Sequence, residues 1–146
     1  MSTTTPFGTQ LIGQTEKTLN AILDRLLAGT GLTEPQWVAL NVAVASGGTV
    51  GRHELAARVA GALKIAEADA DARLGELAAA QLLELAEADA PVTLTDSGQQ
   101  RIAGIRAAVA EITERLWGDL PADDLATAGR VLDAVLERAS AELRSA

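Results

Sequence analysis

One stretch of the sequence, residues 64–98, constrains the fold more than any other: KIAEADADARLGELAAAQLLELAEADAPVTLTDSG. At about 100° per residue, a helix over 66–81 gathers small and apolar side chains on one side, together with one glutamine: Ala66, Ala70, Leu74, Leu77 and Gln81. The apolar runs LLELA (82–86) and VTLT (92–95) predict two strands joined by a tight polar turn at 87–91. We therefore expect a helix followed by a small β-hairpin.

The same stretch carries nearly all of the negative charge of the chain. Between Ala66 and Asp96 there is one basic residue, Arg73, against eight acidic ones, a net charge of −7 in a chain whose net charge is −8. Residues 51–65, just before it, have a net charge of +2. Affinity for nucleic acid comes mainly from Lys and Arg, so any phosphate contacts should be sought in 51–65 and at Arg73.

Helical periodicity accounts for most of the remaining chain. Thr33 followed by Gln36 forms a capping-box pattern with Pro35 in the first turn, which predicts a helix through 46. Glycines at 47–51 end that helix and leave room for a very short extended piece. The other predicted helices cover 7–28, 52–63, about 97–117, and a last segment that begins near Pro121.

The two ends of the chain carry long apolar stripes that a 146-residue monomer has little surface to cover. Only Phe7, Trp37 and Trp117 are aromatic, so Ala, Leu and Val must build the core through close helix contacts. The last helix should bury a stripe of its own, and the helix before it has a seam suited to packing along another long helix. We expect a homodimer in which the first and last two helices interleave. The residues of the two stripes are Ile102, Ile105, Val109, Ile112 and Leu116, and then Leu125, Ala128, Leu132, Val135, Leu136 and Ala139.

Five segments resemble, in order and spacing, the MarR family of bacterial transcriptional regulators: LTEPQWVALNVAVAS, ELAARV, RLGELAAAQLLEL, VTLTDSGQQR and DLPADDLATAGRVLDAVLERA. The resemblance covers almost the whole chain. It implies one mainly α domain over 1–146, with a winged helix-turn-helix lobe at 32–97, a small β-hairpin wing, and dimerisation helices at 7–30 and 98–144. It also implies that the fourth helix enters the major groove of operator DNA, that the wing touches the minor groove, and that a small-molecule effector binds between the dimer-forming helices and the lobe.

Two segments depart from the family pattern. Family wings usually carry an arginine segment between the strands, where this chain has AEADAP (86–91). The recognition helix of the family usually opens with Ser, Thr, Gln, Asn and Arg, where this chain has EADADA (67–72). Acidic side chains accept hydrogen bonds from cytosine, but that contact needs phosphate anchoring nearby.

The predicted DNA-binding residues are Arg52, Lys64 and Arg73. Arg58 and His53 lie beside them, and two further arginines of the fifth helix, at 101 and 106, could meet the DNA backbone. The alternative interpretation is that these are solvated or ion-paired side chains, with Asp69 and Arg73 forming an (i, i+4) pair.

Trp37 and His53 are the predicted ligand-binding residues. Tryptophan stacks on flat ligands, and imidazole titrates near neutral pH. Each has a plainer interpretation: Trp37 lies beside Val38 and Leu40 and suits core packing, and His53 suits the surface at a helix start.

The composition argues against an enzyme. The acidic pairs Asp123/Asp124 and Glu67/Asp71 lack a partner base or a nucleophile at a useful spacing. With no cysteine and one histidine, we expect no metal site and no cofactor. No apolar run approaches the length of a membrane span, and the first residues lack a signal-peptide pattern, so we expect a cytoplasmic protein with no membrane partner.

Two functional hypotheses follow. The first is a homodimeric, ligand-responsive transcriptional regulator that binds double-stranded operator DNA through residues 52–73. The second is a winged-helix dimer with lost or weak DNA binding, whose acidic face engages a protein partner. The acidic helix and wing are the features that separate them.

Overall fold

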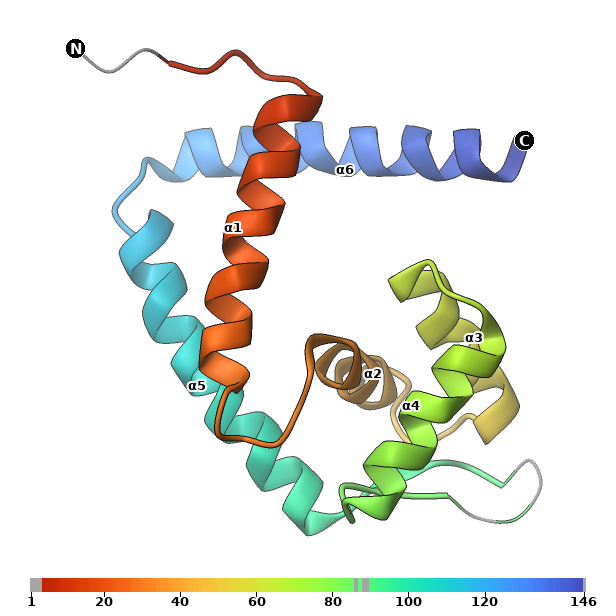
Figure 1. Cartoon of the computed structure of the whole chain (residues 1–146). Helices are drawn as coiled ribbons and strands as arrows, with labels where there is room; N and C mark the ends of the chain where they lie inside the picture. The colour runs from red at the N-terminus through yellow and green to blue at the C-terminus, as the bar shows by residue number, and fades with distance from the viewer. Residues whose placement is uncertain (1–3, 86, 88–89, 146) are drawn as a thin grey trace. The chain divides into compact units, whose positions relative to one another are not determined.

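The computed structural model of the chain describes residues 4–85, 87 and 90–145 (Figure 1). These residues form six α-helices and one two-stranded sheet, as the sequence predicts for a mainly α chain. The chain divides into two compact units, Met1–Val109 and Ala110–Ala146, with the boundary inside α5. The elements are α1 Thr9–Leu27, α2 Glu34–Ala45, α3 Arg52–Leu63, α4 Glu67–Ala79, β1 Leu83–Glu84, β2 Thr93–Leu94, α5 Asp96–Trp117 and α6 Ala122–Ser145.

The start of α2 confirms the predicted capping box. The Thr33 side chain accepts a hydrogen bond from the Gln36 backbone N–H at 3.4 Å, and Gln36 Oε1 accepts one from the Thr33 N–H at 3.0 Å. Pro35 lies in the first turn, where its missing N–H costs no helical hydrogen bond. This cap fixes where α2 begins and leaves the amide nitrogen of Gln36 free for a tertiary contact.

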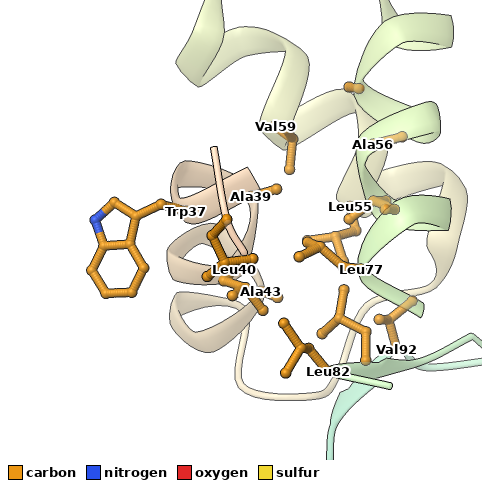
Figure 2. Close-up of a cluster of buried hydrophobic side chains, with 14 of the residues drawn as sticks. Trp37, Ala39, Leu40, Ala43, Leu55, Ala56, Val59, Leu77, Leu82 and Val92 are labelled. Atoms are coloured by element: carbon orange, nitrogen blue, oxygen red, sulfur yellow. The ribbon is translucent and has the colours of Figure 1, made fainter. Parts of the chain in front are cut away.

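The core of the first unit lies where α2, α3 and α4 meet. These helices pack against one another, and Figure 2 shows Leu40, Leu55 and Leu77 pointing into the space between them. The leucines are fully buried, and the alanines among them let the helix backbones approach closely. An Ala- and Leu-built core of helices is therefore confirmed; its small members are Ala39, Ala43, Ala56, Ala60 and Ala70.

The predicted hairpin is present but its strands are short. β1 and β2 pair antiparallel, with Leu83 opposite Leu94 and Glu84 opposite Thr93. The short extended piece after α2 joins them, because Gly51 bridges Pro91 and the Val92 N–H donates to Val50 O at 2.9 Å. Three of the residues between the strands, 86 and 88–89, lie outside the described residues, so the predicted turn at 87–91 is described only in part.

The second unit holds the end of α5 and all of α6, and most of its large apolar side chains are exposed. No described residue of α6 is buried, and Leu132, Val135 and Leu136 are 47%, 37% and 62% exposed. The sequence predicts burial of this stripe together with a homodimer, so the burial stays a prediction. Trp117 is likewise 40% exposed. Among the described residues, no helix combines the length and the apolar character needed to cross a membrane.

Candidate nucleic-acid interface

Helix α4 presents an acidic side to solvent because its apolar side is held in the core. Ala70, Leu74 and Leu77 are buried, as the helical phase predicted, and Glu67 and Asp69 are exposed. The prediction of burial is wrong for the two outer members of the stripe. Ala66 is the exposed N-cap, and Gln81 lies two residues beyond the helix in a left-handed conformation, so neither follows the 100° rotation of the helix.

Arg52, the first residue of α3, is held by Asp71 of α4. Its Nε donates to Asp71 Oδ1 at 2.6 Å and its Nη2 donates to Oδ2 at 3.1 Å, which is a bidentate ion pair. The hydrogen bonds to Asp71 raise the pKa of the Arg52 guanidinium above its ordinary value, so the arginine stays charged. One of the three predicted phosphate contacts is therefore occupied by a carboxylate of the same chain.

Arg73 is paired as well, but with a different residue from the one predicted. Its Nε lies 2.9 Å from Glu76 Oε1, an (i, i+3) neighbour, so the predicted pair with Asp69 is wrong. The geometry does not make a hydrogen bond, and this buried Nε atom has no hydrogen-bond partner among the described residues. Glu76 Oε1 instead accepts from Gln36 Nε2 at 2.9 Å. Glu76 is drawn to the start of α2 because Gln36 is fixed by its capping box.

Lys64 lies at the opposite end of α3 from Arg52, about 18 Å away along the helix axis at 1.5 Å per residue. It is exposed and adopts a left-handed conformation (φ 60°) that ends the helix. Arg58, between them, donates to Glu54 and to Ser46 Oγ, each at 3.1 Å. Arg52 and Arg73 therefore each form an ion pair with an acid of α4, whereas Lys64 lies apart from Arg52 at the other end of α3.

The hairpin adds no basic side chain to this face. Glu84 of β1 is exposed, and the segment 86–91 contains no Lys or Arg. Because an acidic wing repels phosphate, any contact of the hairpin with DNA must come from backbone groups or neutral side chains.

Neither predicted ligand-binding residue lines either of the two pockets described below. Trp37 is 8% exposed within the core cluster, and in Figure 2 its indole projects to the side of α2 away from Leu55 and Leu77. His53 is exposed at the start of α3. Trp37 thus has the packing role that the sequence also allowed, and ligand binding by either residue stays a prediction.

A pocket of about 600 Å³ lies between the end of α2, strand β2 and the first half of α5. Arg106 is its charged residue, and its Nη2 donates to Asn41 Oδ1 at 2.8 Å. A second pocket, of about 470 Å³, lies on another side of α5 next to the end of α1, where Arg101 donates to Thr30 O. The role predicted for both arginines was contact with the DNA backbone, and neither cavity was predicted.

A signal for the larger pocket exists in the sequence. Its α5 residues have the (i, i+3, i+4, i+7) spacing of one helix face: Gln99, Ile102, Ala103 and Arg106. A face that mixes a glutamine and an arginine with an isoleucine is neither core nor ordinary surface, and such mixed linings are typical of ligand pockets. Among the described residues, no three His, Asp or Glu side chains gather closely enough to hold a metal ion.

Comparison with known proteins gives a likeness in structure only. No protein-family model matches the sequence, and no curated protein matches it. Among solved structures, MepR from S. aureus in complex with DNA has a TM-score of 0.74 and 18% identity, and covers 91% of this chain and 98% of its own. CouR from Rhodococcus jostii bound to p-coumaroyl-CoA has a TM-score of 0.72 and 17% identity, and covers 86% and 88%.

A mutant of MarR from E. coli is similar over the largest part of the chain among these three structures. Its TM-score is 0.69 at 19% identity, and the match covers 92% of this chain and 99% of that one. At such identities the likeness establishes the fold, which is the winged helix that the sequence predicted.

Proposed function

We propose that this chain, which has the fold of the MarR regulators, is a homodimeric transcriptional regulator that binds operator DNA and responds to a small molecule. The observation that carries the proposal is the arrangement of α4, which α2 and α3 hold by its apolar side while the other side faces solvent. MepR, which shares this fold, was solved in complex with DNA. A helix presented in this way fits the major groove of B-DNA.

The basic residues of this face would hold phosphate rather than bases. Arg52 and Arg73 flank the exposed side of α4, and Lys64 extends the contact along α3. Each phosphate contact releases a counterion, and this release makes the affinity fall as the salt concentration rises. Few phosphate contacts therefore mean weak binding with a shallow salt dependence. We expect binding that is detectable at low salt and strongly dependent on these three side chains.

The pocket beside Arg106 is the candidate effector site. Its volume of about 600 Å³ lies within the range of small-molecule sites, and it joins the wing strand β2 to α5. CouR, with the same fold, was solved with p-coumaroyl-CoA. A ligand here would change the position of the wing relative to α5, and so shift the population between two spacings of the DNA-reading lobes. Trp37 and His53, which do not line this pocket, stay predicted ligand contacts.

The exposed stripe of α6 supports the homodimer. Leu132, Val135 and Leu136 form one apolar side of a helix with no buried residue, and soluble helices seldom leave such a stripe uncovered. A second copy of the chain would cover it with the same residues around a two-fold axis. Two lobes related in this way would read half-sites about one helical turn apart.

A titration tests the DNA-binding proposal. Fluorescence anisotropy at about 50 mM salt, with duplex DNA from upstream of the coding sequence of this protein, should show a saturable complex that outcompetes a scrambled duplex. Arg52→Gln should weaken the complex, and Arg130→Gln on α6 should leave it unchanged. Absence of any sequence-specific complex at this salt concentration would rule out direct operator binding.

A second candidate function rests on the charge of α4. Glu67 and Asp69 are exposed, and the three arginines nearby, Arg52, Arg58 and Arg73, are each already paired with an acid. Such a surface would suit a basic protein partner. Co-precipitation of a basic protein at moderate salt should be lost on charge reversal at Asp69, Asp71 and Glu76. Binding that persists in this triple variant would exclude the acidic face as the interface.

A further inference from the structure

We propose that Asp71 competes with DNA phosphate for Arg52, so that this ion pair limits how tightly the α3–α4 face holds nucleic acid. The inference rests on the proposed DNA-binding function and deepens it by naming the residue that limits affinity. A carboxylate and a phosphate both offer two oxygens to a guanidinium, so one edge of Arg52 serves either group, but not both at once.

The geometry of the pair supports competition. Asp71 takes hydrogen bonds from both Nε and Nη2 of Arg52, at 2.6 and 3.1 Å, which is the edge that would face a phosphate. A methyl group placed at Gly75 would lie 3.7 Å from Arg52 Nη2. The guanidinium therefore lies along α4 between Asp71 and Gly75, one helical turn apart, on the helix that would enter the groove.

The exposure of the pair makes exchange possible. The side chains of Arg52 and Asp71 are 38% and 45% exposed. Water and salt screen an ion pair this exposed, so it contributes little net stability and a DNA phosphate is able to displace it. After displacement, Asp71 stays beside the phosphate as an uncompensated negative charge. The competition for Arg52 and the repulsion of phosphate by Asp71 both lower the affinity for DNA.

The ion pair between Arg73 and Glu76 is held differently and is not the pair that limits the affinity for DNA. Glu76 is also bound by Gln36, which belongs to the capping box of α2, and the Arg73 Nε atom is buried. Displacing Glu76 from Arg73 would therefore also disturb a side chain that Gln36 of α2 holds, whereas displacing Asp71 from Arg52 breaks this one ion pair.

Two variants of α4 with the same change in charge separate competition from general repulsion. Asp71→Asn frees Arg52, and Asp69→Asn removes one negative charge two residues away without breaking any of the ion pairs found in the described residues. Binding of a fluorescein-labelled short DNA duplex is measured by anisotropy between roughly 50 and 200 mM NaCl. Asp71→Asn should bind about fivefold more tightly than Asp69→Asn. Its log–log salt slope should be steeper by about one per subunit.

Two further variants test whether the gain in affinity depends on the side chain introduced at position 71 and on Arg52. Asp71→Ser repeats the comparison with a different neutral side chain, and thermal unfolding followed by circular dichroism verifies that each variant is folded. Adding Arg52→Gln to Asp71→Asn should cancel the gain, since the freed arginine is then missing.

The outcomes distinguish this inference from the proposed function. Equal affinities and slopes for Asp71→Asn and Asp69→Asn, with binding by the unchanged protein, would overturn the competition and leave DNA binding intact. A gain that persists without Arg52 would overturn it as well. If neither the unchanged protein nor Asp71→Asn binds the duplex at the lowest salt, the proposed DNA-binding function fails, and the inference fails with it.

Discussion

At the scale of single residues, Gln81 adopts a backbone conformation that its side chain disfavours. Its φ of 65° is left-handed, and it follows α4 where the Leu82 N–H donates back to Leu77 O at 3.0 Å. Glycine is the usual residue in this position because it has no Cβ to clash. The Gln81 side chain is exposed, while its backbone N–H donates to Ala78 O at 2.9 Å and its carbonyl accepts from Thr95 Oγ1 at 2.6 Å.

Gln81→Gly should therefore stabilise the protein. Relief of the left-handed strain should raise the free energy of unfolding by about 0.5–1 kcal/mol, after the larger entropy of glycine in the unfolded chain is subtracted. Urea denaturation measures this change in the free energy of unfolding. Gln100→Gly, in the interior of α5, is the matched control and should lower the free energy of unfolding by about 0.5–1 kcal/mol. A loss of stability at both positions would contradict the argument.

Glu34 makes stability depend on pH. Partial burial, and then the negative charges of Asp24 and Glu16, raise the pKa of this carboxyl above its ordinary value of 4.5. A raised folded-state pKa means that the ionised carboxylate destabilises the fold above the unfolded-state pKa. This penalty disappears as pH falls through the raised pKa and the folded protein takes up the proton.

Glu34→Gln should accordingly be more stable than the unchanged protein at pH 7, and the difference should shrink to zero as the pH falls below about 4. The difference is small because Glu34 is only partly buried. Thermal unfolding at a series of pH values measures it, and Glu111→Gln on the exposed part of α5 is the control. A difference that grows toward low pH would have the wrong sign for this mechanism.

At the scale of elements, periodicity predicted the helices, and a local cap predicted where α2 begins. Thr33 and Gln36 were identified as a cap from their spacing. The cap of α5 is Thr95, which accepts from the Gly98 N–H at 2.9 Å and was not predicted. The ion pairs could not be predicted in the same way. Arg52 and Asp71 are 19 residues apart, so only the packing of α3 on α4 brings them together. The pairing of Glu76 with Gln36, 40 residues away, depends equally on packing.

The junction between the hairpin and α5 depends on Gly98. A Cβ at this buried glycine would lie 2.2 Å from the carbonyl oxygen of Leu82, a backbone atom that also accepts the Thr95 N–H at 3.1 Å. Gly98→Ala should force the hairpin and α5 apart and lower the free energy of unfolding by about 1–3 kcal/mol. Gly61→Ala on α3, where no heavy atom lies within 4 Å, should raise it by up to about 1 kcal/mol.

Chemical denaturation of both alanine variants tests the junction. Because Gly98 precedes Gln99, which lines the pocket beside Arg106, its variant should also weaken any coupling between ligand and DNA binding. Equal stabilities for the two variants would show that the close approach at Leu82 relaxes without cost.

At the scale of the whole molecule, charge and apolar surface point to different partners. The acids of α4 and the hairpin oppose phosphate, while α6 carries a stripe of exposed apolar side chains. The sequence revealed both features, since each depends only on composition along one element. It could not reveal which surface covers the α6 stripe, because burial is a property of the assembled fold and of its copies.

If a second copy covers α6, one charge in the stripe should separate the subunits. Leu136→Glu would bury an unpaired carboxylate in the interface, at a cost of several kcal/mol per ion, and sedimentation velocity should show a monomer in place of the dimer. Ala134→Glu places the same carboxylate about 160° around the helix and should leave the dimer intact. The monomeric variant should also lose most of its affinity for a two-half-site operator, because each lobe then binds alone. A dimer that survives Leu136→Glu would locate the interface on another part of the chain.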